Sequence, residues 1–226
     1  MNPTISHVVI YSHGFGVRKS DRGLFTAIST AMPDLESILF DYNVINKKSN
    51  TLTAATFEEQ TRKLRKTINA ARAEHPGAVI DLVCHGQGCV AAALLKPRGI
   101  RKVIMLAPPD DMSPETVAKQ LASQTEATID PAVTTRIPRA DGRTTVIEPE
   151  YWRELADIDL VRLYNRLARF TTLRIMNAKE DELLGEVAFE GIDPGISLVR
   201  LQGGHNFDDE ESRKRILYIL QKELSV

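Results

Sequence analysis

The 226-residue sequence lacks the features that mark membrane, secreted and nucleic-acid-binding proteins. No apolar run approaches the roughly 20 residues that span a bilayer, and no cationic segment precedes an apolar core as in a signal peptide. The formal net charge is -1, which leaves no excess of positive charge for nucleic acid. These absences predict a cytoplasmic protein with no membrane span and no nucleic-acid partner.

Cysteine is scarce as well, since the chain has only Cys84 and Cys89. Two cysteines this close together form neither a disulfide framework nor a zinc-spaced cluster, so reduced thiols are expected. The five histidines include no helix-spaced or short-loop pair of metal ligands. The sequence therefore predicts no metal site and no cofactor, and it carries no signal for an oligomeric state.

What the sequence does contain is a regular alternation of β-rich and helix-period segments. The apolar share of 42% and the charged share of 26% are ordinary for a globular chain. The longest helical segment begins with a capping-box pattern at Thr56 and Glu59. The alternation predicts a single α/β domain over residues 1–226, with a doubly wound, mostly parallel sheet of six strands. Strands are expected at 7–14, 36–43, 78–86, 101–109, 171–181 and 196–204, and helices at 23–32, 56–74, 87–95 and 208–224.

One stretch, between Pro109 and Phe170, interrupts the alternation because it contains no core-strand pattern. An insertion at this point would lie over the C-terminal edge of the sheet, where doubly wound proteins bind ligands. We therefore predict a small cap at about 110–157, with ordinary surface helices as the alternative. The expected elements are a helix at 113–124, a hairpin at 134–148 that turns at "ADG", and a helix at 150–168.

Three arginines of this insertion form a charged cluster: Arg136, Arg139 and Arg143. They could face an anionic substrate. The alternative is a solvated face, because arginine is mostly an exposed residue.

The stretch "VCHGQGCVAAALL" (83–95) is the strongest candidate for chemistry. A buried strand passes through a turn of small residues straight into a helix, which resembles the nucleophile elbow of α/β hydrolases. In this resemblance Gly86 takes the nucleophile position, and the backbone amide of Gln87 takes an oxyanion-hole position. The earlier stretch "YSHGFG" (11–16) resembles the histidine-glycine loop of the same family, which implies a second oxyanion-hole amide at Phe15.

Two later segments resemble the parts of the family that complete a catalytic triad. The segment "MNAKEDELL" aligns Asp181 with the acid, although Glu180 and Glu182 could exchange roles with it, and "LQGGHNF" aligns His205 with the base. The four motifs follow the family's order, each at the end of a predicted strand. The chain therefore resembles a compact six-stranded α/β hydrolase of the serine esterase or acyl-hydrolase type. The resemblance implies a small-molecule ligand of the acyl or ester type.

The sequence departs from the family at Gly86, where a serine would carry the attacking hydroxyl. With glycine there, His205 and Asp181 have no hydroxyl to activate. Glycine does suit a strained turn, because a side chain in a sparsely populated backbone conformation costs about 1–3 kcal/mol. The sequence thus predicts a hydrolase-like protein that is inactive or strongly impaired. The alternative is a pseudoenzyme that binds a small carbonyl or carboxylate ligand or a protein partner.

Other polar side chains near these motifs have simpler interpretations. Cys84 and Cys89 are expected to pack as small buried hydrophobes, and Ser12 is expected to bond the backbone, although each is a conceivable substitute nucleophile. His13 and His85 are expected to be hydrogen-bonded structural histidines. A metal site at this edge of the sheet is the alternative.

Overall fold

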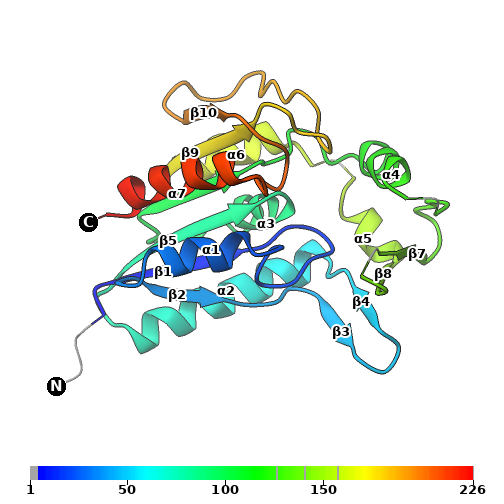
Figure 1. The fold of residues 1–226 in the computed structure, drawn as a ribbon, viewed down its shortest axis with the longest axis horizontal. Coiled ribbons are helices and arrows are strands. Elements are labelled where there is room, and N and C mark those ends of the chain that lie inside the picture. The colour runs from blue at the N-terminus through cyan, green and yellow to red at the C-terminus, as the bar shows by residue number, and fades with distance from the viewer. Residues whose placement is uncertain (1–4, 126, 140, 157, 226) are drawn as a thin grey trace.

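The computed structural model describes residues 5–225 except 126, 140 and 157, and its centre is a six-stranded sheet (Figure 1). The strands lie in the order β10-β9-β6-β5-β1-β2, and every neighbouring pair is parallel. The chain builds outward from β1 in both directions, which confirms the predicted doubly wound α/β sheet. The strands are β1 (His7–Ser12), β2 (Glu36–Leu39), β5 (Val79–His85), β6 (Lys102–Leu106), β9 (Thr172–Ala178) and β10 (Ser197–Leu201).

Helices cover both faces of the sheet and bury two separate cores (Figure 1). Along β1, Val8 and Ile10 join one core while Val9 and Tyr11 join the other. Because both faces are buried along the central strands β1, β5 and β6, these strands carry near-continuous apolar runs. Within the described ranges, no helix has the length and apolar character needed to cross a membrane. One core is covered by α1 (Leu24–Ala31) and α7 (Glu210–Leu224), and the other by α2 (Phe57–Glu74), α3 (Gln87–Leu95) and α6 (Leu160–Ala168).

The packing of α3 against β1 depends on Gly88. A Cβ atom at this residue would lie 2.1 Å from the carbonyl oxygen of Ser12, which is closer than the two atoms can approach. Most of α3 is buried and its side chains are small. The end of β1 and the start of α3 can therefore come together, which places the turn at Gly86 beside the loop that follows β1.

Two local predictions are confirmed. The capping box of α2 is present, because the Thr56 hydroxyl accepts from the Glu59 backbone N–H at 3.3 Å and the Glu59 carboxylate accepts from the Thr56 N–H at 3.2 Å. The hairpin is also present, with β7 (Thr135–Pro138) antiparallel to β8 (Thr144–Ile147). It follows α4 (Pro114–Ser123), so these elements lie in the inserted stretch between β6 and β9.

The hairpin does not stand alone, which the sequence did not predict. A second hairpin, formed by β3 (Val44–Asn46) and β4 (Thr51–Thr53), pairs with it through parallel contacts between β4 and β8. Together they make a small sheet of order β3-β4-β8-β7 at one end of the molecule (Figure 1). Strands of three residues carry too short a pattern to recognise, and their pairing is between distant parts of the chain.

The single helix predicted at 150–168 is wrong. The structure has a short α5 (Pro149–Arg153) and a separate α6. The second helix restarts because the Asp159 side chain accepts a hydrogen bond from the Arg162 backbone N–H at 2.9 Å, which makes Asp159 an N-cap. The break lets α5 turn toward the sheet edge while α6 packs on the core with α3.

Candidate active site

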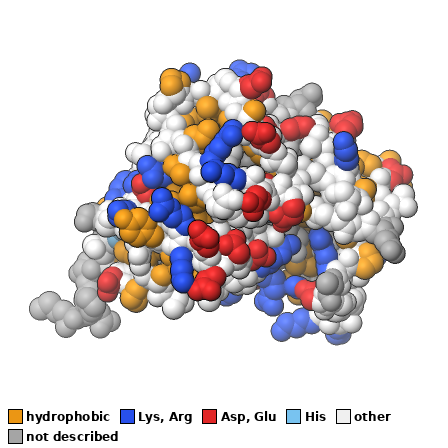
Figure 2. All heavy atoms as spheres, turned by 45° about the horizontal axis from the view of Figure 1, so that its top comes forward, with side chains coloured by type: hydrophobic (Ala, Val, Ile, Leu, Met, Phe, Trp, Pro, Cys, Tyr) orange, Lys and Arg blue, Asp and Glu red, His pale blue; other side chains and the backbone are white. Residues whose placement is uncertain are grey.

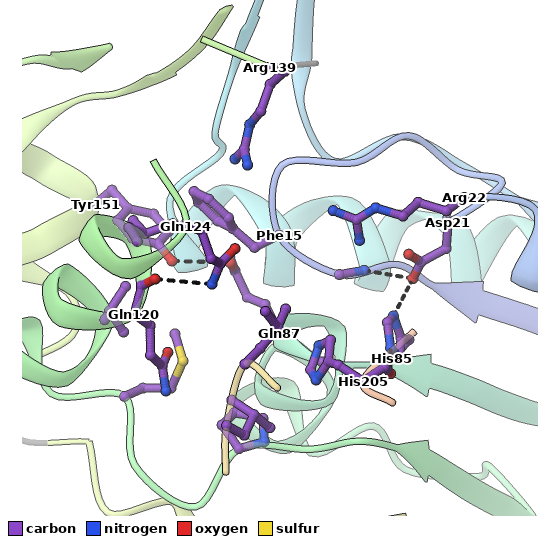
Figure 3. A pocket seen from close by; sticks show the side chains of 18 residues that line it. Phe15, Asp21, Arg22, His85, Gln87, Gln120, Gln124, Arg139, Tyr151 and His205 are labelled. Carbon is purple, nitrogen blue, oxygen red and sulfur yellow. Dashed lines mark hydrogen bonds and ion pairs between the residues drawn. The ribbon is translucent and has the colours of Figure 1, made fainter. Parts of the chain in front are cut away.

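A cavity of about 100 Å³ opens at the C-terminal edge of the six-stranded sheet (Figure 3). Its floor comes from the loops that follow β1, β5 and β10, which contribute Phe15, Gly86 and His205. Its outer wall comes from the inserted stretch, including Gln120 of α4 and Tyr151 of α5. The described segments thus bring all four sequence motifs and the inserted stretch to one place.

The turn at Gly86 has the backbone of a strained elbow. Its φ of 49° and ψ of -121° lie where residues with side chains are rare. The Gly86 N–H donates to the Leu106 carbonyl at 3.0 Å, and its carbonyl accepts from the Cys89 N–H at 3.0 Å. A Cβ atom on Gly86 would lie 3.4 Å from His205 Nε2. A side chain at position 86 would therefore point at the imidazole.

His205 is held by Asp181. The Nδ1–H of the imidazole donates to Asp181 Oδ2 at 2.8 Å, and both side chains are buried. The other carboxylate oxygen, Oδ1, accepts from the backbone N–H groups of Leu183 at 3.0 Å and Leu184 at 2.8 Å. With Nδ1 protonated toward the carboxylate, a neutral imidazole presents Nε2 as a proton acceptor on the side of Gly86.

The two glutamates that flank Asp181 have other partners. Glu182 accepts from the backbone N–H of His205 at 3.0 Å, and Glu180 accepts from the Gln202 side chain. Neither reaches the imidazole ring of His205 within hydrogen-bond distance. Of the three acidic residues that the sequence left open, Asp181 is therefore the one that orients the ring.

Two backbone amides at the cavity are available to an oxyanion. Phe15 and Gln87 both line the cavity beside Gly86, and among the described residues neither amide donates a hydrogen bond. The side chain of Gln87 is fixed by Tyr151, whose hydroxyl donates to Gln87 Oε1 at 3.0 Å, and Tyr151 packs on Phe15 with 5.7 Å between ring centroids. The inserted stretch thus holds both residues in place.

Beneath the turn, His85 is hydrogen-bonded as predicted, and it forms a buried ion pair with Asp21, which the sequence did not single out. His85 Nδ1 bonds to Asp21 Oδ2 at 2.8 Å and His85 Nε2 bonds to the carbonyl of His205 at 3.0 Å. Both ring nitrogens face acceptors, so only the doubly protonated ring satisfies them. Burial lowers the pKa of His85, but the charge and hydrogen bond of Asp21 outweigh it, so the pKa of His85 is raised.

Asp21 belongs to a strained turn. The residues Asp21, Arg22 and Gly23 all have positive φ, at 46°, 52° and 87°. Burial raises the pKa of the Asp21 carboxyl. The charge and hydrogen bond of His85 act in the opposite direction and outweigh burial, so the pKa of Asp21 is lowered. No periodic pattern identifies such a turn. The stretch "SDRG" is the only signal that the sequence offers for it.

The substitute nucleophiles are fully buried. Ser12 Oγ donates to the Gly88 carbonyl at 2.9 Å, as expected for a backbone-bonding hydroxyl. Burial raises the pKa of the Cys84 thiol to about 12 and that of Cys89 well above its ordinary value. None of the three lines the cavity. They are therefore poor candidates for attack on a ligand held beside His205.

His13 is locked in a neutral state. Its Nδ1–H donates to the Gly14 carbonyl at 2.9 Å and its Nε2 accepts from the Tyr42 N–H at 2.9 Å. Burial lowers the pKa of His13. Across the part of the chain that the structure describes, no group of three or more His, Cys, Asp or Glu side chains is placed to hold a metal ion.

The three arginines of the insertion separate. Arg139 lines the cavity, and its guanidinium lies 5.9 Å from the centroid of the Phe15 ring. Arg143 forms an ion pair with Asp141, and Arg136 is exposed on β7. A fourth arginine, Arg22, lines the cavity from the strained turn (Figure 3).

Comparison with known proteins identifies the fold. No protein-family model and no curated protein matches the chain. Solved structures match it along nearly its whole length. Est1E from Butyrivibrio proteoclasticus with bound ferulic acid has a TM-score of 0.69 and 18% identity, over 99% of this chain and 91% of that one.

Two further structures agree. The esterase domain of a Rhodothermus marinus protein has a TM-score of 0.66 and 15% identity, over 99% of this chain and 88% of that one. A monoacylglycerol lipase of Paleococcus ferrophilus has a TM-score of 0.64 and 16% identity, over 96% and 93% of the two chains. The chain has the α/β-hydrolase fold, as the resemblance of its motifs predicted.

Proposed function

We propose that this protein has the architecture of an ester or acyl hydrolase, and that its turnover is strongly impaired because residue 86 has no hydroxyl. One observation carries the proposal: the missing side chain of Gly86 would point at Nε2 of His205, which Asp181 orients. The amides of Phe15 and Gln87 would stabilise the oxyanion that forms on an attacked carbonyl. The inserted stretch at about 110–157 would act as the cap that encloses the acyl group.

Without a serine at residue 86, ester hydrolysis can still proceed slowly by direct attack of water. A water molecule that enters beside Gly86 could be deprotonated by Nε2 of His205 and attack a bound ester directly. In triad hydrolases that lose one member, the oxyanion hole and binding alone retain about 10³- to 10⁴-fold catalysis over water. We therefore expect weak hydrolysis from the protein as it stands, and His205→Ala should remove the part of it that depends on deprotonation of the water.

The test is to supply the missing hydroxyl. Gly86→Ser should hydrolyse short activated esters such as 4-nitrophenyl acetate and should be labelled by a serine-directed fluorophosphonate. Gly86→Ala is the matched control, because it carries the same backbone strain but no hydroxyl. If Gly86→Ser folds and shows neither turnover nor labelling, the assignment of the site is wrong.

A pseudoenzyme that only binds is the second candidate, and the two amides without acceptors favour it. An oxyanion hole without a nucleophile can still hold a carboxylate or carbonyl group through backbone N–H donors. Thermal stabilisation of the unmodified protein by small carboxylates or esters, with no product formed, would favour binding over catalysis.

A further inference from the structure

A second cavity, of about 400 Å³, adjoins the first and shares two of its residues, Arg22 and Arg139. Arg18 and Arg143 complete its basic lining. Figure 2 shows Lys and Arg side chains gathered at the lower right of the molecule, the end that carries the two hairpins in Figure 1. The opening of the candidate active site therefore leads into a region of positive charge.

The two shared arginines have no acidic partner. Within the described part of the chain, neither Arg22 nor Arg139 forms an ion pair. The carboxylates nearby are committed elsewhere, because Asp21 pairs with His85 below the cavity and Asp141 pairs with Arg143. Among the described residues, the one carboxylate that lines the second cavity, Asp141, is thus paired with Arg143, and the cavity keeps an excess of positive charge from Arg18, Arg22 and Arg139.

Each of these two guanidinium groups has a hydrogen-bond partner in the protein. Arg139 Nε donates to Thr145 Oγ1 at 2.9 Å, and a Cβ atom on Gly16 would lie 2.7 Å from its terminal nitrogen, so a side chain at residue 16 would displace the guanidinium. Arg22 has a φ of 52°, and its side chain donates to Asn206 Oδ1 at 2.8 Å. In Figure 3 the Arg139 side chain points down toward Phe15 from above, and the Arg22 side chain points toward Phe15 from the right.

The two cations are close enough to act on one another. Burial lowers the pKa of Arg139, and the charge of Arg22 lowers it further. A bound anion would relieve this repulsion. One carboxylate can be satisfied by one guanidinium fork, whereas a phosphate monoester offers three oxygens and nearly two negative charges to a pair of arginines that approach from different loops.

We propose that the junction of the two cavities is a phosphate subsite, in which Arg22 and Arg139 hold the phosphate of an acyl ester whose carbonyl lies at Gly86. The proposal rests on the proposed function for the position of the ester, but the subsite itself requires no catalysis. Its phosphate could belong to a soluble metabolite or to a lipid headgroup, and these share the same chemistry.

The binding test measures, by isothermal titration calorimetry, the affinity of the unmodified protein for inorganic phosphate. Arg22→Gln and Arg139→Gln should each weaken phosphate binding about tenfold or more, since a charge-assisted hydrogen bond is lost. Arg136→Gln is the matched control, because Arg136 lies on the same hairpin as Arg139, is exposed and lines neither cavity. Acetate should bind about tenfold more weakly than phosphate.

The outcomes separate the two proposals. No phosphate binding, or equal binding by all variants, overturns the subsite, and equally tight acetate binding overturns its assignment to phosphate. Thermal unfolding shows whether each variant is folded. Because the two arginines are replaced in separate variants, the test can still be made with the second variant if the first does not fold.

Substrate preference is tested in Gly86→Ser. At low substrate concentration, the Gly86→Ser variant should cleave 1-butanoylglycerol 3-phosphate about tenfold faster than 1-butanoylglycerol. Adding Arg139→Gln to this variant should remove the preference. The same comparison with oleoyl esters distinguishes a lipid from a soluble source. If Gly86→Ser is inactive on every ester while phosphate still binds, only the proposed function fails. If the neutral esters are cleaved equally well, the subsite fails.

Discussion

The side of Gly86 that lacks a Cβ atom faces the imidazole of His205, with 3.4 Å between the Cβ position and Nε2. A hydroxyl one bond further along would be within hydrogen-bond reach of that nitrogen. The backbone at residue 86 has a positive φ of 49°, the conformation of a strained turn. The relationship separates two properties of the candidate site: a side chain at residue 86 would reach His205, and glycine supplies none.

The first prediction concerns stability at the elbow. Gly86→Ser and Gly86→Ala should each lower the free energy of unfolding by about 1–3 kcal/mol, because a side chain is forced into a rare backbone conformation. Urea unfolding followed by circular dichroism measures this loss. Only the serine variant should gain activity. Equal stability of all three proteins would show that the backbone at this turn is not strained.

The second prediction concerns the orienting acid. In the Gly86→Ser background, Asp181→Asn should lower kcat by about 10³- to 10⁴-fold, because the imidazole loses the acceptor that fixes its tautomer. Glu180→Gln is the matched control, since this neighbour bonds to Gln202 instead of His205. A steady-state assay with 4-nitrophenyl acetate compares them. Similar losses in both variants would remove Asp181 from its assigned role.

The core of the fold could be predicted from the sequence because its signals are local. The central strands β1, β5 and β6 are buried on both faces, so each appears as an apolar run, and α2 begins with a complete capping box. The small sheet could not be predicted, since β4 gains its partner β8 only when distant parts of the chain meet. The break between α5 and α6 was missed because apolar spacing continues through it.

Some residues of the candidate site could likewise be predicted from the sequence, and others could not. Gly86 and Asp181 end predicted strands and His205 directly follows one, so the topology of a parallel sheet places them together. Asp21 and Arg22 come from an irregular turn whose direction depends on consecutive positive φ values. Their positions depend on tertiary contacts with His85 and Asn206, which leave no pattern in the sequence.

The third prediction concerns the approach of α3 to β1. Gly88→Ala should lower the free energy of unfolding by about 3 kcal/mol, since the added methyl group would overlap the backbone of Ser12 and force the helix to shift. The comparison variant is Gly77→Ala, where the added atom meets nothing within 4 Å and the cost of about 1–2 kcal/mol comes from the φ of 83° alone, so the loss at Gly88 should be the larger one. Urea unfolding compares the two. A loss no larger than that of the control would show that α3 can move at little cost.

The fourth prediction concerns the pH dependence of the ion pair under the elbow. The pKa of His85 is raised, so its contribution to stability is complete below about 6.5, the ordinary histidine value, and is lost as pH rises through the folded pKa. The pKa of Asp21 is lowered, so its contribution is present above about 3.9 and is lost as pH falls through its folded pKa. The pair should therefore stabilise the fold most between these two values.

Asp21→Asn tests this prediction, because it removes the charge and keeps the shape of the side chain. At pH 5 the variant should be less stable than the unmodified protein by about 3 kcal/mol, as expected when a buried pair loses one partner, and the difference should shrink by pH 9. Urea unfolding at pH 5, 7 and 9 measures it. Asp159→Asn, at the N-cap of α6 and without a histidine partner, should show no such trend. A difference for Asp21→Asn that is constant or grows with pH would mean that His85 is neutral in the folded protein.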